Sequence, residues 1–258
     1  MGFERELTAI NRWLGRTDRM ALEHLDAGAR VETKADGTPV TAADRAIEAE
    51  LRARIDSEFR GDAVLGEEEG FVTSVGGGRR WIIDPIDGTK NYARGIPIFA
   101  TLVALEVNGT LEVGVVSAPA LRARWWATRG GGAFRDGAPI GVSTVSSLAD
   151  AHVCSGDAIR YAEAAGRLDG FLALCRGSAR HRGFGDFYGH MLVAEGAVDV
   201  MVEFPGVSVW DMAAVAVIVT EAGGRFSSLD GEDRVDAGDA LTSNGLLHDE
   251  VLALLRAR

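Results

Sequence analysis

The chain has 258 residues, of which 47% are hydrophobic and 25% charged, and its formal net charge is −11. This is the composition of a globular protein with enough residues for a substantial core. An acidic chain lacks the positive electrostatic field that would attract nucleic acids or anionic membrane surfaces, which argues against both as partners. An anionic substrate remains compatible with this charge if a bound divalent cation reverses the local sign.

No segment predicts a membrane span or a secretory leader. Residues 1–16 are charged from Glu4 onward, and no run reaches the roughly 18 apolar residues that cross a bilayer. Cys154 and Cys175 show neither CxxC spacing nor a metal-finger pattern, which predicts reduced thiols. We therefore expect a cytoplasmic protein.

Periodicity and turn signals predict an α+β first half. Apolar residues at helical spacing predict a helix over 4–28, with an interruption considered at Gly15. Turn residues in 31–44 predict a hairpin or loop, and Thr41 is placed to cap a helix over 41–59. Short strands are predicted at 62–69, 80–84, 99–107, 110–120 and 124–134, with a hairpin at Asn108-Gly109.

The second half alternates predicted helices and apolar strands and ends in a predicted helix over 245–258. We therefore expect a layered α+β/α/β chain. Residues 1–140 would form an α+β part with an antiparallel sheet and most of the candidate metal ligands. Residues 141–258 would form an α/β part, and the two would act as one functional unit.

The segment RRWIIDPIDGTKNYARGIPIF, residues 79–99, carries the pattern that points to chemistry. Its apolar strand ends at Asp84, and strand pairing is expected to stop there because Pro85 has no N–H to donate. The Ile86 carbonyl and the Asp87 carboxylate can then turn to the same side as Asp84.

Gly88 and Thr89 follow these oxygens and would present backbone N–H groups at the first turn of a helix, which suits a phosphate. Hard oxygen donors beside such an anion seat are the ligands that Mg²⁺ prefers. The segment therefore predicts a magnesium site next to a phosphate site.

Two further acidic segments are candidates for the same site: Glu67–Glu69 in LGEEEG, and Asp211 at the start of a predicted buried helix. Each has a structural alternative, since the glutamates suit a solvated turn and Asp211 suits a helix N-cap. Asp84 and Asp87 alone also suit an Asx-type turn. Four carboxylates that converge would repel one another without a cation, so convergence would imply a metal.

These segments resemble the motifs of the inositol monophosphatase family of Mg²⁺-dependent phosphatases. WIIDPIDGTKNYARGIP is similar to the family's first motif almost residue for residue, GEEEG to its acidic turn, and WDMAAVAVIVTEAGG to its C-terminal motif. The resemblance extends over nearly the whole chain, including TPVTAAD. It implies a five-layered αβαβα sandwich, a homodimer, and a small-molecule phosphate ester as substrate.

Carried over by position, the resemblance implies two Mg²⁺ ions. Glu67, Asp84 and the Ile86 carbonyl would bind the first. Asp84, Asp87 and Asp211 would bind the second.

The resemblance also assigns the phosphate and the attacking water. Gly88 and Thr89 would hold the phosphate by backbone N–H groups, and Asp211 also belongs to the expected substrate-binding set. Glu67 and the Thr89 hydroxyl would activate the water. Asp44 would support that site, or a weaker third metal ion through water.

Residues 180–199 bear on the alcohol part of the substrate. Many inositol phosphatases have a Gly-Thr-Ala-Ala-like turn here, whereas this chain has Gly185-Asp186-Phe187 with Arg182 before it. This pattern looks like the histidinol-phosphate phosphatase branch, which serves histidine biosynthesis. Carboxylates at Asp186 and Glu203 would complement the cationic part of histidinol phosphate, and Arg182 would contact the phosphate or a neighbouring group.

Alternatives remain open for these three residues and for the function. Asp186 also suits a helix cap and Arg182 a solvated surface charge. Glu203 lies eight residues before Asp211, whereas the family's substrate-contacting glutamate usually lies seven before. The alternative substrates are inositol-1-phosphate and other sugar phosphates. The alternative class is a metal-binding module without catalysis.

Overall fold

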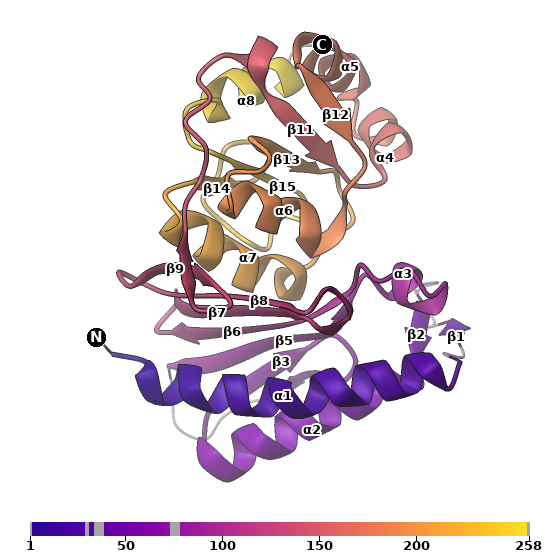
Figure 1. Ribbon diagram of the computed structural model, residues 1–258, viewed down its shortest axis with the longest axis vertical. Coiled ribbons are helices and arrows are strands. Elements are labelled where there is room, and N and C mark those ends of the chain that lie inside the picture. Colours follow the sequence, from indigo (N-terminus) through magenta and orange to yellow (C-terminus); the bar gives the residue numbers. More distant parts are fainter. Residues whose placement is uncertain (1, 29–30, 34–38, 73–77, 257–258) are drawn as a thin grey trace.

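The structure is a computed structural model that describes residues 2–28, 31–33, 39–72 and 78–256. Helices and sheets alternate in five layers along the long axis of the molecule (Figure 1). This is the αβαβα sandwich that the family resemblance implied, and it agrees with the layered α+β/α/β chain that the sequence patterns predicted.

Helices α1 (Glu4–Asp26) and α2 (Ala42–Glu58) form the first layer and cover one face of the first sheet (Figure 1). The helix α1 is continuous through Gly15, so the interruption considered there does not occur. A glycine inside a helix costs roughly 1 kcal/mol, and burial of the apolar face around Trp13 outweighs that cost.

Thr41 caps α2 as predicted, because its Oγ1 accepts the N–H of Ala43 at 3.2 Å. The predicted hairpin before α2 is also present. The strand β1 (Val31–Thr33) pairs antiparallel with β2 (Pro39–Thr41), and residues 34–38 between them lie outside the described residues.

The first sheet has eight described strands in the order β10-β9-β8-β7-β6-β5-β3-β4. All neighbours are antiparallel except β3 and β5, which are parallel. The predicted strand over 124–134 is in fact two strands, because Gly130 between them has a φ of 72° and allows a tight turn. The bounds are β3 (Ala63–Gly66), β4 (Gly70–Val72), β5 (Arg79–Asp87), β6 (Ala100–Val107), β7 (Thr110–Ala118), β8 (Ala123–Thr128), β9 (Gly132–Arg135) and β10 (Ala138–Ile140).

Strand β5 does not end at Pro85, which corrects the prediction from the sequence. Asp84 pairs with Leu102 and Asp87 with Ala100, so three steps along β5 match two steps along β6. One extra residue in a strand is a β-bulge, and it reverses the alternation of side chains beyond it. The bulge therefore lets Asp84 and Asp87 face the same side.

Helices α6 (Asp186–Ala194) and α7 (Val209–Glu221) form the middle layer between the two sheets (Figure 1). The residues from Met212 to Val219 are all buried, because α7 is covered by a sheet on each side. A helix that is apolar all round suits this position.

The second sheet has five described strands in the order β12-β11-β13-β15-β14, and the last layer of helices covers its outer face (Figure 1). Short elements link the layers: α3 (Thr89–Ala93) and the 3₁₀ turns η1 (Pro119–Leu121) and η2 (Leu148–Asp150). The remaining bounds are β11 (His152–Ser155), β12 (Arg180–Arg182), β13 (Val200–Glu203), β14 (Arg225–Ser227), β15 (Ala240–Ser243), α4 (Ala158–Ala164), α5 (Leu168–Gly177) and α8 (His248–Arg256).

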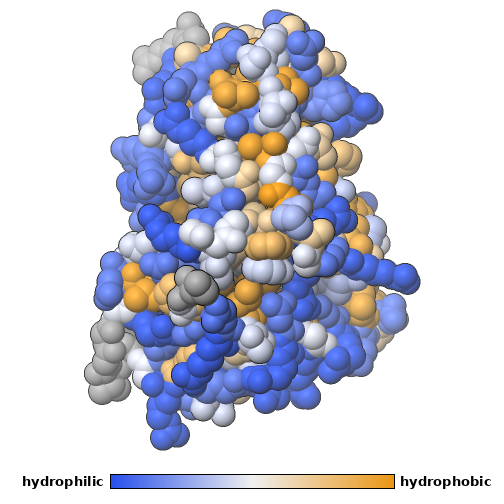
Figure 2. All heavy atoms as spheres, turned by 60° about the vertical axis from the view of Figure 1, so that its left-hand side comes forward, coloured by the Kyte–Doolittle hydropathy of each residue, from blue (hydrophilic) through white to orange (hydrophobic). Residues whose placement is uncertain are grey.

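Polar residues cover most of the face shown in Figure 2, and apolar residues lie between them in small groups. Among the described helices, none combines the length and the apolar character needed to cross a bilayer. Cys154 and Cys175 are free thiols, as predicted.

Candidate active site

Three carboxylates from two distant parts of the sequence meet at the edge between the first sheet and the middle helices. Asp84 and Asp87 come from the bulge of β5, and Asp211 comes from the first turn of α7. One oxygen from each lies within 4.8 Å of the others. Asp211 is held in place by the N–H of Ser208, which donates to its Oδ2 at 2.6 Å. The N-cap of α7 is Ser208, so Asp211 is not the N-cap that the sequence also allowed. It completes the capping box from the third helical position and at the same time belongs to the cluster.

The electrostatics of this cluster favour a bound cation. Burial raises the pKa of Asp84 well above its ordinary value, and the nearby charges of Glu67, Asp87 and Asp211 raise it further. Burial likewise raises the pKa of Asp211 to about 6 and that of Asp87 well above its ordinary value. Carboxylates that repel one another at low dielectric are stabilised by a cation between them.

The atoms of the cluster fit a magnesium ion. The Oδ1 atom of Asp84 is buried and has no hydrogen-bond partner among the described residues, although a buried polar oxygen normally has one. All three groups offer hard carboxylate oxygens, the donor type of Mg²⁺ sites.

Glu67 lies beside this cluster but is not one of its three members. It directly follows β3, which runs parallel to β5 with Gly66 opposite Ile83, the residue before Asp84. Its charge raises the pKa of both Asp84 and Asp211. The parallel pairing of the two strands therefore places the acidic turn next to the cluster.

The Thr89 hydroxyl lies between two of the predicted site groups. Its Oγ1 donates to the carbonyl of Ile86 at 2.9 Å and lies 3.5 Å from Oδ1 of Asp44. Asp44 is fully buried, and its other oxygen accepts the N–H of Thr41 at 2.8 Å. Asp44 thus completes the capping box of α2, whose N-cap is Thr41, and also faces Thr89.

Gly88 is the N-cap of α3 and has a φ of 80°. A Cβ at this position would lie 2.9 Å from the carbonyl oxygen of Ile98. Both the torsion and the close approach therefore require glycine. This conformation brings Gly88 and Thr89 to the wall of the same cavity as Glu67.

That cavity has a volume of about 460 Å³ and is lined by both halves of the chain. Asp186 begins α6 and accepts the Nδ2–H of Asn91 at 3.0 Å, while its own N–H donates to Oε1 of Glu203 at 3.0 Å. Glu203 ends β13 and lines the cavity despite its eight-residue distance from Asp211. Burial raises the pKa of both carboxyls.

Asp157 and Asn91 line the cavity as well, although no sequence pattern pointed to either residue. Asp157 comes two residues after β11, and Glu203 ends the neighbouring parallel strand β13. The carboxyl ends of neighbouring parallel strands commonly form binding sites, and this rule could have drawn attention to Asp157.

Comparison with known proteins agrees with this geometry. The sequence model of the inositol monophosphatase family matches residues 7–258. The chain belongs to the inositol monophosphatase family. It is 51% identical over 235 residues to the histidinol-phosphatase of Mycobacterium tuberculosis, an alignment that covers 88% of each chain. As a member of this family, it is a phosphatase that acts on phosphate monoesters.

Solved structures have the same fold. The IMPase of Thermotoga maritima is 31% identical, with a TM-score of 0.87, and the match covers 97% of this chain and 96% of that one. An IMPase/NADP phosphatase in complex with Mg²⁺ and phosphate has a TM-score of 0.88 at 24% identity, covering 100% of this chain and 97% of that one.

Of the predicted site residues, Glu67, Gly88, Thr89, Asp186 and Glu203 line the cavity of this phosphatase, whereas Asp44, Asp84, Ile86, Asp87, Asp211 and Arg182 are not among its lining residues. Arg182 is the one that also lies apart from the carboxylate cluster and the Thr89 hydroxyl. It lies on the edge strand β12, where its Nη1 donates to the carbonyl of His181 at 2.8 Å. Its side chain lines a separate hollow with Phe184 and Tyr188. A contact between Arg182 and substrate therefore stays a prediction that this placement does not support.

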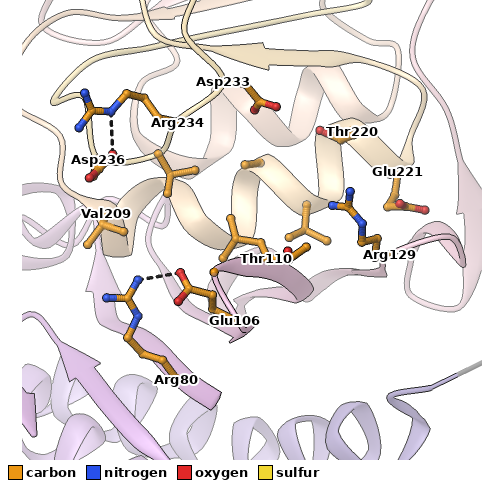
Figure 3. A pocket seen from close by; sticks show the side chains of 15 residues that line it. Arg80, Glu106, Thr110, Arg129, Val209, Thr220, Glu221, Asp233, Arg234 and Asp236 are labelled. Carbon is orange, nitrogen blue, oxygen red and sulfur yellow. Dashed lines mark hydrogen bonds and ion pairs between the residues drawn. The ribbon is translucent and has the colours of Figure 1, made fainter. Parts of the chain in front are cut away.

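A wider cavity of about 640 Å³ lies along α7 (Figure 3). None of the three clustered aspartates is among its lining residues. Arg80 Nη2 lies 2.7 Å from Oε2 of Glu106, and Arg234 Nε lies 2.9 Å from Oδ1 of Asp236. These acidic groups are thus neutralised by arginines, whereas the carboxylates of the cluster face one another. The wider cavity is for that reason not the candidate active site.

Proposed function

We propose that this phosphatase hydrolyses L-histidinol phosphate to L-histidinol and phosphate. The observation that carries the proposal is the acidic wall of the active-site cavity, made by Asp157, Asp186 and Glu203. Among the described residues that line the cavity, Lys90 is the only basic one, and its Nζ lies 3.4 Å from Oδ2 of Asp157. Lys90 is thus paired with Asp157, which leaves Asp186 and Glu203 to face the cationic part of the substrate. An alcohol part with an ammonium and an imidazole complements such a wall, whereas the hydroxyls of an inositol need neutral hydrogen-bonding partners.

The degree of similarity supports the same substrate. Identity is 51% to a histidinol-phosphatase but 31% to the IMPase of Thermotoga maritima. Hydrolysis of inositol-1-phosphate or of other sugar phosphates is therefore the less favoured alternative.

We assign the metal ligands as the motif predicts. Glu67, Asp84 and the Ile86 carbonyl would hold one Mg²⁺, and Asp84, Asp87 and Asp211 a second. Bound Mg²⁺ lowers the pKa of a coordinated water and neutralises phosphoryl and leaving-group oxygens. The short distances among the three aspartates and the unpartnered Oδ1 of Asp84 support this assignment.

The chain's own groups then hold the phosphate and orient the water. The backbone N–H groups of Gly88 and Thr89 would bind the phosphate at the cavity wall. The Thr89 hydroxyl proton is directed to the Ile86 carbonyl, so its oxygen can accept a hydrogen bond from a water. Asp44 Oδ1 lies 3.5 Å from the Thr89 hydroxyl oxygen. It could therefore accept the Thr89 proton when the Ile86 carbonyl binds Mg²⁺. Glu67 is the carboxylate placed to take the proton from the water.

Asp186 and Glu203 would bind the cationic end of the substrate. Both lie on the cavity wall contributed by the second half of the chain, whereas Gly88 and Thr89 belong to the first half. The substrate would therefore lie across the boundary between the two halves. A homodimer, a cytoplasmic location, a place in histidine biosynthesis and a third Mg²⁺ stay predictions from the resemblance.

The test is phosphate release with Mg²⁺ from L-histidinol phosphate and from inositol-1-phosphate, measured side by side. We expect higher kcat/KM on histidinol phosphate, with activity lost in EDTA. A preference for inositol-1-phosphate would overturn the substrate while leaving the metal site as described.

Replacement of Asp186 then tests the acidic wall. Asp186 has a φ of 55°, a conformation that asparagine tolerates and alanine resists, so D186N is the suitable variant. D186N should lower kcat/KM on histidinol phosphate about tenfold or more, because 1.4 kcal/mol of lost binding is a factor of ten. It should change inositol-1-phosphate turnover far less. Equal losses on both substrates would refute the role in specificity.

A further inference from the structure

The acidic turn that carries Glu67 is held by two side chains of α2. Glu48 is fully buried, and its Oε2 accepts the N–H of Glu68 at 2.8 Å while its Oε1 accepts the N–H of Glu69 at 3.0 Å. Arg52 Nε donates to Oε1 of Glu48 at 2.8 Å. The buried carboxylate therefore has a cation and two backbone donors, the pairing that a buried charge needs.

Arg52 also holds the far end of the turn. Its Nη2 donates to the carbonyl of Gly70 at 2.7 Å. The Glu48–Arg52 pair thus binds both the N–H groups at the start of the turn and the carbonyl at its end. A single ion pair fixes the turn at three backbone positions.

Gly66 shows that the fit between the turn and this pair is tight. A Cβ at Gly66 would lie 2.3 Å from Oε1 of Glu48, so no larger residue leaves room for the carboxylate. Gly66 is the last residue of β3, directly before Glu67. The glycine lets the Glu48 carboxylate approach the backbone from which Glu67 projects.

Asp44, Glu48 and Arg52 are four residues apart on α2, a spacing that places them along one face of the helix. Asp44, at one end of this face, lies 3.5 Å from the Thr89 hydroxyl. Glu48 and Arg52, at the other end, contact the acidic turn. One helix face therefore contacts the Thr89 hydroxyl and the turn that carries Glu67, the two places from which the proposed function draws the groups that act on the water.

We propose that Glu48, fixed by Arg52, is a positioning residue for Glu67. The N–H of Glu68 belongs to the peptide unit that follows the Cα of Glu67, so holding it fixes a backbone torsion that aims the Glu67 side chain. A ligand held by its neighbours binds a metal more tightly than one that must be ordered on binding. Because the role of Glu67 is itself part of the proposed function, this inference rests on it.

The test compares two matched variants of one helix. Glu50 forms an ion pair with Arg54 at the same spacing on α2, with Arg54 Nε 2.9 Å from Oε1 of Glu50, but it does not contact the turn in the described structure. Binding of Mg²⁺ without substrate, measured by calorimetry, should be about tenfold weaker in E48Q than in wild type. It should be nearly unchanged in E50Q. In turnover of histidinol phosphate, E48Q should lower kcat more than it raises KM.

A double-mutant cycle separates positioning from general loss of structure. If Glu48 acts through Glu67, then E48Q should weaken Mg²⁺ binding much less in an E67Q background, because the group that it positions is gone. An undiminished effect of E48Q in that background would overturn the proposal, as would wild-type Mg²⁺ binding by a folded E48Q.

Should E48Q fail to fold, R52K takes its place in the same cycle. Lysine keeps a positive charge beside Glu48 but lacks the forked geometry that also reaches Gly70. A loss of Mg²⁺ affinity in R52K that is smaller than tenfold and that shrinks when E67Q is also present would support the proposal. A loss that is the same with and without E67Q would overturn it. The wild type controls for the proposed function: absence of Mg²⁺ binding or hydrolysis there would refute that function, whereas a failure confined to the variants refutes only the positioning role.

Discussion

The main-chain N–H of Phe187 donates to Oδ2 of Asp87 at 2.6 Å, a contact between residues 100 positions apart in the sequence. It joins the start of α6, in the second half of the chain, to the bulge of β5 in the first half. Asp186, the residue before Phe187, lines the substrate cavity. The carboxylate cluster and the acidic wall are therefore connected through one hydrogen bond, and a shift of α6 would alter both.

The first prediction concerns the charge of Asp87. Asn in place of Asp87 keeps an oxygen that can accept the Phe187 N–H but removes one of the converging negative charges. We therefore expect D87N to raise the melting temperature in EDTA, because burial and neighbouring carboxylates disfavour the charged form of this group. The same variant should lose the stabilisation by Mg²⁺ and most of the phosphatase activity, as thermal melts with and without Mg²⁺ can show.

Asp56, which is exposed on α2, provides the control for D87N. D56N should melt as the wild type does in both conditions. A D87N protein that is less stable than wild type in EDTA would show that the Asp87 charge is not a source of strain in the cation-free fold.

The second prediction concerns two glycines that flank α3. Gly88 and Gly95 have φ angles of 80° and 71°, so alanine should cost each about 1 kcal/mol or more in backbone strain. Only at Gly88 would the new Cβ meet another atom closely, the Ile98 carbonyl oxygen at 2.9 Å, whereas nothing lies within 4 Å at Gly95. G88A should therefore displace the turn and lower kcat by up to about a hundredfold, as a shift of 1 Å at a catalytic site can.

G95A serves as the matched variant, since it introduces similar strain without the contact. Urea unfolding and steady-state kinetics on both proteins are the measurements. If G95A lowers kcat as much as G88A, the loss comes from strain in α3 and not from displacement of the phosphate seat.

The third prediction concerns pH and follows from the pKa of about 6 for Asp211. In the cation-free protein this pKa is raised above the unfolded value, so the folded state binds the extra proton between about pH 4 and pH 6 and stability falls as the pH rises through that window. Mg²⁺ must displace the proton at low pH. At about pH 5 only about a tenth of Asp211 is ionised, so apparent Mg²⁺ affinity should be about tenfold weaker than at about pH 8.

Calorimetric titration of Mg²⁺ at the two pH values tests this directly, and more protons should be released on binding at the lower pH, where Asp211 is protonated. In D211N the Mg²⁺ affinity should differ less between the two pH values than it does in wild type. An affinity independent of pH in the wild type would contradict the raised pKa.

Much of the fold could be predicted from local sequence because its elements carry their own signals. Thr41 at the start of α2, Asn108-Gly109 between β6 and β7, and the apolar run that became α7 are examples. In each case the structure depends on torsions or periodicity within a few residues, which the sequence shows directly.

The rest depends on contacts between distant residues. Nothing local in the sequence around Pro85 indicates that β5 resumes pairing with β6, since the bulge depends on the partner strand. The wall position of Asp157 follows from its strand lying parallel to β13, and the placement of Arg182 away from the cavity follows from β12 being an edge strand. The resemblance to the family motifs predicted that Asp84, Asp87 and Asp211 converge, whereas their spacing in the sequence did not decide this.

The last prediction concerns acid stability and His190, a buried histidine outside the active site. The ring is fully buried with Nδ1 2.8 Å from the Thr242 hydroxyl oxygen, and burial lowers its pKa to about 3. The unfolded state takes up this proton near its ordinary pKa of about 6.5, whereas the folded state does not. The stabilising effect of the neutral ring is therefore complete above about pH 6.5 and decreases as the pH falls. At about pH 5 the loss amounts to about 2 kcal/mol from this residue.

The measurement is the free energy of unfolding in urea with EDTA at several pH values. H190Q keeps a partner for Thr242 but does not titrate, so its free energy of unfolding should fall less than that of wild type between about pH 7 and pH 5, by about 2 kcal/mol. Replacement of His152, which is exposed, controls for the loss of a histidine as such. The carboxylate cluster affects wild type and H190Q alike, because its groups are unchanged, so the difference between the two curves isolates His190. Parallel curves would mean that the His190 ring takes up its proton in the folded state as readily as in the unfolded chain.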